Sequence, residues 1–170
     1  LLTSESYGEL SLLLGILSIL LVPTGTIQTV LTREIAKLDK RGEMGKIFFM
    51  VRQFSKKLLF FSSLMSFALF FSSPFLAKFF KNEELSIPLQ LLSVGIPFMF
   101  LSSIILAYHR GREKVRILAT LMIVGPLTKF LLGVFLVTLG LGLIGATISL
   151  WAGALLLSSL LLFFLGKPYR

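Results

Sequence analysis

The chain alternates between long apolar segments and short polar connections. Five apolar segments of about 21 to 25 residues are visible, at residues 8–31, 58–80, 87–107, 115–139 and 141–165. A helix of that length is roughly 30 to 38 Å long, which is enough to cross a hydrocarbon core about 30 Å thick. The segments are apolar on every face, whereas a surface helix of a soluble protein needs a polar face. The pattern therefore predicts an all-α, polytopic membrane helix bundle with five transmembrane helices.

The basic residues predict how these helices are oriented. Cytoplasmic loops of membrane proteins are enriched in Lys and Arg, and here basic residues follow the first, third and fifth segments, whereas the other side has only Lys78 and Lys81. We therefore expect a multi-pass protein of the cell (plasma) membrane in which residues 33–57, 108–114 and 166–170 are cytoplasmic. The basic residues in and beside these regions are Arg33, Lys37, Lys40, Arg41, Lys46, Arg52, Lys56, Lys57, Arg110, Arg112, Lys114, Arg116, Lys167 and Arg170.

The net charge of +9 and the pI near 10.2 follow from this topology, so nucleic acid is not an expected partner. The basic linker 33–57 is expected to contact membrane lipids, since each basic residue near an anionic surface adds about 1 kcal/mol. Within it, Ile47, Val51, Phe54 and Leu58 recur on one helical face. This spacing predicts an interfacial helix that leads into the second apolar segment.

The predicted orientation places Leu1 outside the cell, yet the chain begins without Met or a cleavable leader. We expect at least one further spanning helix before Leu1, so the chain is a partial transmembrane lobe whose partners include the remaining helices of the same polypeptide. The short connections near residues 108–114 and 139–142 predict that the third and fourth segments, and the fourth and fifth, are antiparallel neighbours.

Small residues and prolines mark packing and bending points within the membrane. Small residues let membrane helices approach closely, and proline frees a backbone carbonyl and bends its helix. Such bends suit a transporter, but channels, receptors and membrane enzymes also contain them. The predicted packing stripes are Gly145, Ser149 and Gly153, and Ser11, Gly15 and Ser18; the prolines are Pro23, Pro97 and Pro126.

Lys129 is the residue that departs most from the hydrophobic pattern. It lies near the middle of the fourth segment, with Gly125 and Gly133 on the same helical face. A lysine at that depth costs about 2.5 to 3.5 kcal/mol on insertion scales, so it is expected to face protein or water. Three interpretations remain open: contact with a substrate or cavity, a structural pair with a carboxylate elsewhere, and snorkelling to an interface about 15 Å away.

A weaker candidate site lies at the cytoplasmic end of the first segment. Gly25, Thr29 and Arg33 share a helical face there, and Gln28 lies beside it. Arginine binds phosphate through a bidentate fork. The alternative is that Arg33 is an ordinary positive-inside anchor of the helix.

Enzyme chemistry has little support in the sequence. There is no cysteine and only one histidine, His109, which is expected to be a solvated loop residue beside Arg110. Neither a metal site nor a catalytic triad can be assembled from these groups. Glu83 and Glu84 lack the third carboxylate that a metal-dependent lipid-diphosphate enzyme needs. No Walker-type loop is present, so we expect no enzyme activity, metal or cofactor.

Five short motifs occur in a fixed order along the chain. They are Ser6-Tyr7-Gly8, Thr32-Arg33-Glu34-Ile35-Ala36, Ile96-Pro97-Phe98, Arg110-Gly111-Arg112 and Leu139-Gly140-Leu141-Gly142-Leu143-Ile144-Gly145-Ala146-Thr147. Together with the lysine-bearing fourth segment, they resemble the amino-terminal half of polysaccharide flippases in the multidrug/oligosaccharidyl-lipid/polysaccharide exporter superfamily. The similarity covers nearly the whole chain.

The resemblance implies two six-helix lobes around a central cavity, of which this chain supplies helices two to six of the first lobe. It also implies transport of an isoprenoid-diphosphate-linked oligosaccharide by alternating access, with Lys129, Arg33 and Gln28 as substrate contacts. One alternative is a multidrug or organic-cation extruder of the same superfamily, which a mid-membrane lysine disfavours. Another is a non-transporting scaffold or assembly subunit, but this alternative does not explain Lys129. A membrane glycosyl or prenyl transferase would require an acidic cluster elsewhere.

Overall fold

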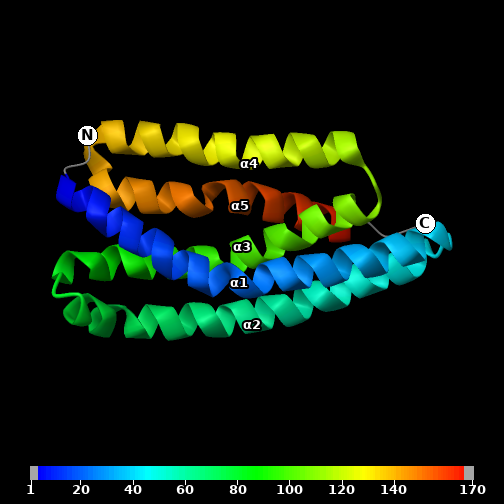
Figure 1. Ribbon diagram of the computed structural model, residues 1–170, viewed down its shortest axis with the longest axis horizontal. Helices are drawn as coiled ribbons and strands as arrows, with labels where there is room; N and C mark the ends of the chain where they lie inside the picture. Colours follow the sequence, from blue (N-terminus) through cyan, green and yellow to red (C-terminus); the bar gives the residue numbers. More distant parts are fainter. Residues whose placement is uncertain (1–3, 167–170) are drawn as a thin grey trace.

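The computed structural model describes the backbone of residues 4–166 and the side chains of residues 7–159. The described chain is all-α, and its long helices run roughly along one axis (Figure 1). This confirms that the chain is all-α, as predicted. In chain order the elements are α1 (Ser4–Lys40), α2 (Met44–Phe79), the short η1 (Glu83–Leu85), α3 (Ser86–Gly111), α4 (Val115–Leu136), the kinked η2 (Val137–Leu141) and α5 (Gly142–Gly166).

Helix α3 is the centre of the bundle. It packs against α1, α2 and α5, and its residues Leu89, Leu92, Ile96, Phe100 and Ile104 have no exposed surface. The outer faces of α2 and α4 instead carry large exposed apolar side chains, which is the arrangement expected for a protein whose solvent is lipid. Among the described residues, four candidate membrane spans result, at Tyr7–Lys40, Met44–Phe79, Glu83–Gly111 and Val115–Ser159.

The last candidate span contains two helices. Its 45 residues include α4 and the part of α5 up to Ser159. Where the two helices meet, Gly140 and Gly142 have φ of +89° and +49°. Glycine adopts such left-handed values without strain, so the chain reverses there, and α4 and α5 lie side by side (Figure 1). The predicted antiparallel pairing of the fourth and fifth segments is confirmed.

The expected linker 33–57 is not a separate segment. It consists of the end of α1, a tight turn and the start of α2, which have 37 and 36 residues and are therefore about 55 Å long. Gly42 has φ +70° and its N–H donates to the Asp39 carbonyl at 3.0 Å, closing the turn. This turn and the α3–α4 connection lie at the same end of the bundle, which we call the basic end (Figure 1).

The prediction of an interfacial helix is wrong. The stripe Ile47, Val51, Phe54 and Leu58 does share one face, but Ile47, Val51 and Leu58 are buried and Phe54 packs against the core. The stripe therefore faces the bundle rather than a membrane surface, because α2 continues through it without a break.

One of the two predicted packing stripes is confirmed. A Cβ added at Gly153 would collide with the Gly125 carbonyl, and one at Gly133 would lie 3.0 Å from the Ser149 hydroxyl, so α4 and α5 touch through small residues. The expected pairing of the third and fourth segments is wrong, because α5 packs against both α3 and α4 and lies between them (Figure 1).

The second predicted stripe does not pack against any described helix. Ser11, Gly15 and Ser18 are exposed, and a Cβ added at Gly15 would have nothing within 4 Å. The two hydroxyls donate to carbonyls one turn back in α1, to Tyr7 at 2.9 Å and Leu14 at 2.7 Å.

The prolines lie inside continuous helices, and two of the freed carbonyls are satisfied by serines. Pro97 removes the donor for the Ser93 carbonyl, which instead accepts the Ser66 hydroxyl of α2 at 2.7 Å. Pro74, which the sequence analysis did not single out, frees the Phe70 carbonyl, which accepts the Ser73 hydroxyl at 2.8 Å. Bending at Pro23, Pro97 and Pro126 stays a prediction.

Candidate functional site

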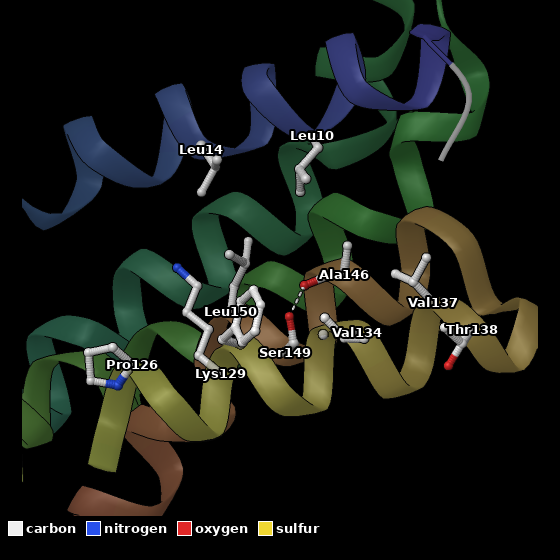
Figure 2. Close-up of a pocket in the computed structure, with 12 residues that line it drawn as sticks. Leu10, Leu14, Pro126, Lys129, Val134, Val137, Thr138, Ala146, Ser149 and Leu150 are labelled. Carbon is white, nitrogen blue, oxygen red and sulfur yellow. Dashed lines mark hydrogen bonds between the residues drawn. The ribbon is translucent and has the colours of Figure 1, made fainter. Parts of the chain in front are cut away.

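A cavity of about 540 Å³ lies between α1, α4 and α5 (Figure 2). This volume is within the range of roughly 300 to 1,000 Å³ that is typical of small-molecule sites. Its lining comes from α1 (Leu10, Leu14), α4 (Pro126, Lys129, Phe130, Gly133, Val134), η2 (Val137, Thr138) and α5 (Ala146, Ser149, Leu150).

Lys129 is the charged residue of this cavity. Gly125 and Gly133, one turn to either side, lie against α5 and bring the two backbones close together. Lys129 is half-buried between these two contacts, and Figure 2 shows its side chain rising from α4 toward α1. By helix rise it lies about 21 Å from the start of α4 and about 10 Å from its end.

No described residue pairs with Lys129. Within residues 7–159 its ammonium group makes no hydrogen bond or ion pair, and the three ion pairs of the described side chains involve other residues. Seven of the chain's eight carboxylates belong to these residues. Their carboxylates are Glu9, Glu34, Asp39, Glu43, Glu83, Glu84 and Glu113.

The hydroxyls that line the cavity already have acceptors. Ser149 donates to the Ala146 carbonyl at 2.7 Å, drawn as a dashed line in Figure 2, and Thr138 donates to the Phe135 carbonyl at 2.8 Å. Because each hydroxyl has one proton, neither is free to donate to a ligand. The cavity therefore combines one unpaired cation with largely apolar walls.

Arg33 and Gln28 do not join this site. Both lie on α1, but Arg33 is 19 residues beyond Leu14, which corresponds to about 28 Å along the helix. Arg33 is exposed on the same face as Gly25 and Thr29, as predicted, whereas Gln28 is half-buried. The structure thus separates the predicted candidates into a cavity with Lys129 and a helix face near the basic end.

A third group of polar side chains lies at the basic end and was not predicted from the sequence. Arg112 contacts the Asp39 carboxylate at 3.0 Å and donates to the Tyr108 hydroxyl at 2.8 Å, which joins α1 to the end of α3. Burial disfavours the charged guanidinium, but Tyr108 and Asp39 outweigh it, so the pKa of Arg112 lies above its ordinary value. His109 is half-buried in the last turn of α3 beside Tyr108, so its expected loop position is wrong.

The same end shows why Arg110-Gly111-Arg112 contains a glycine. A Cβ on Gly111 would lie 2.8 Å from the Thr32 carbonyl and 2.8 Å from the Ile35 side chain, so only glycine lets α3 end against α1. Elsewhere in the described residues, no three His, Cys, Asp or Glu side chains are close enough to hold a metal ion.

These features define an all-α protein with apolar helices long enough to span a membrane and an open cavity that contains one unpaired lysine. The polysaccharide biosynthesis protein family matches residues 1–170, the whole chain. The chain belongs to this family, which is of the flippase type within the exporter superfamily, and the resemblance drawn from its motifs is confirmed. No curated protein and no solved structure matches the chain.

Proposed function

We propose that the chain is part of a flippase that moves an isoprenoid-diphosphate-linked oligosaccharide from the cytoplasmic to the outer leaflet by alternating access. The observation that carries this proposal is the unpaired Lys129 in the cavity between α1, α4 and α5. Membership of the polysaccharide biosynthesis protein family supports a glycan-related substrate.

The energetics of Lys129 favour an anionic substrate. An ammonium group near mid-membrane costs about 2.5 to 3.5 kcal/mol, and this cost is normally offset by a partner. The described residues supply no carboxylate, whereas a diphosphate would supply the missing charge and several acceptor oxygens. A cation extruder would place its substrate beside a like charge, which disfavours that alternative.

The proposed function includes the number of membrane spans and their orientation. α4 and α5, with 22 and 25 residues, are about 33 and 38 Å long, so each is long enough to span by itself. We propose that each does so, which gives five spans. These spans form most of one lobe of the transporter. The basic end then faces the cytoplasm, with residues 33–57, 108–114 and 166–170 on that side; residues 167–170 lie outside the described part.

Arg33 and Gln28 have a separate role in this proposal. Arg33 is exposed on the part of α1 nearest the basic end, where a guanidinium can bind a headgroup phosphate through two parallel hydrogen bonds. We propose that this face receives the diphosphate before it reaches Lys129. An Arg33→Lys protein that exports glycan at the wild-type rate would reduce Arg33 to an anchor of the helix.

Substitution of Lys129 tests the function directly. We expect Lys129→Ala, in the native polypeptide in its host, to abolish surface glycan while leaving the amount of membrane-inserted protein unchanged. Lys46→Ala is the matched control, because Lys46 is also a lysine but pairs at the surface with Glu43 at 2.9 Å. Undiminished glycan export by Lys129→Ala, or drug sensitivity without a glycan defect, would contradict the proposal.

A further inference from the structure

The cavity beside Lys129 is unsuited to sugar. Its apolar walls include the side chains of Leu10 and Leu14 from α1, Phe130 and Val134 from α4, and Val137 from η2. The hydroxyls of Ser149 and Thr138 are committed to carbonyls of their own helices. A glycan has many hydroxyls, and each one buried without a partner costs free energy.

We propose that this cavity binds the lipid end of the substrate. The phosphate group next to the chain contacts the Lys129 ammonium, and the first part of a single isoprenoid chain lies along α4 between Leu14 and Val134. The glycan stays outside this cavity. The inference rests on the proposed function and assigns a chemical group to one part of its site.

The apolar lining of the cavity continues along the helix beyond Lys129. Lys129 and Val137 are eight residues apart, so the apolar strip extends about 12 Å beyond the cation. Figure 2 shows Leu10 and Leu14 on the α1 side of this strip, opposite the side chains of α4. The proposed substrate carries one chain on its phosphate, whereas a glycerophospholipid carries two chains from one headgroup, so phosphatidic acid is the competitor that tests this assignment.

The charge supplies the selectivity. A hydrocarbon chain gains little by leaving lipid for an apolar cavity, because lipid is already apolar. The contact between Lys129 and the phosphate is available in the cavity but not among the lipid chains of the bilayer. An uncharged polyprenol cannot make this contact and should therefore bind weakly. An inorganic diphosphate ion should also bind weakly, because it must lose its hydration shell among apolar walls.

The test fills the strip without touching Lys129. We expect Val134→Trp, which places an indole in the cavity, to weaken binding of a photoreactive polyprenyl phosphate by at least tenfold, measured on the full chain in phosphatidylcholine nanodiscs. Val124→Trp is the matched control, since Val124 is an exposed valine of α4 outside the cavity lining, and it should bind within twofold of the wild type. Polyprenol should bind at least tenfold more weakly than polyprenyl phosphate, and inorganic diphosphate should not compete.

Three results would overturn the inference: wild-type affinity in Val134→Trp, equal affinity for polyprenol, or displacement of the probe by an equal concentration of phosphatidic acid. Failure of the subsite is separable from failure of the proposed function. Normal binding by Val134→Trp together with lost export by Lys129→Ala contradicts only the subsite, whereas normal export by Lys129→Ala contradicts the function.

Discussion

The hydrogen bond from Ser66 to the Ser93 carbonyl predicts a measurable loss of stability in Ser66→Ala. Pro97 leaves this carbonyl without its helical donor, and Ser66 supplies a replacement from the neighbouring helix at 2.7 Å. Interhelical hydrogen bonds in membranes average about 0.6 kcal/mol and reach about 1.7. We expect a loss of about 1 kcal/mol, a roughly fivefold change in the unfolding equilibrium, because the carbonyl is left unsatisfied.

The assay is reversible SDS unfolding of the full chain in micelles. Ser62→Ala is the matched control, because the Ser62 hydroxyl donates within α2 to the Leu59 carbonyl at 3.1 Å, and it should lose less than Ser66→Ala. In a Pro97→Ala background, the N–H of residue 97 can bond to the Ser93 carbonyl, so the effect of Ser66→Ala should shrink. An equal loss in both backgrounds would refute the reasoning.

Three further predictions concern packing, the basic end and topology. Gly153→Ala should lower the stability by about 1 to 3 kcal/mol in the same assay, because the added methyl group collides with the Gly125 carbonyl. Gly15→Ala is the control and should leave the stability unchanged, since its methyl group has nothing within 4 Å. Equal effects of the two variants would argue against close α4–α5 packing. Asp39→Asn should lower the stability by about 1.5 kcal/mol, because it weakens the partly buried contact with Arg112. Lys37→Met breaks an exposed ion pair with Glu34 and should lower the stability by less than about 0.5 kcal/mol. A larger loss in Lys37→Met than in Asp39→Asn would contradict a stabilising role for the Asp39–Arg112 contact. The chain has no cysteine, so single cysteines can report the topology. Lys46→Cys and Lys114→Cys should react with a membrane-impermeant maleimide only from the cytoplasmic side, and Glu83→Cys only from outside. Labelling of all three from one side would contradict the proposed spanning of α2 and α3.

Local patterns predicted much of the fold and part of the candidate site. The apolar segments, the Gly145, Ser149 and Gly153 stripe and the exceptional position of Lys129 depend on residues within a few turns of one another. Helical periodicity and the cost of burying charge act at that range. The structure places Gly153 against α4, as its pattern predicts. It places Lys129 in the lining of a cavity, which is the location that one of its three interpretations requires.

Features that depend on distant residues were missed. Residues 33–57 are rich in charge and were expected to form a linker, but long charged side chains are also good helix formers, so α1 and α2 continue through them to Gly42. Asp39 and Arg112 are 73 residues apart, and Ser66 and Ser93 are 27 apart. These contacts arise from the packing of α1 and α2 around α3, which one-dimensional periodicity does not encode.

The most direct test of the central claim is the leaflet position of the lipid-linked oligosaccharide in cells that express Lys129→Ala or Lys129→Arg in place of the wild type. The account predicts that the oligosaccharide accumulates in the cytoplasmic leaflet with Lys129→Ala and is partly exported with Lys129→Arg, because arginine keeps the cation at the cavity. Complete export with Lys129→Ala would contradict the account.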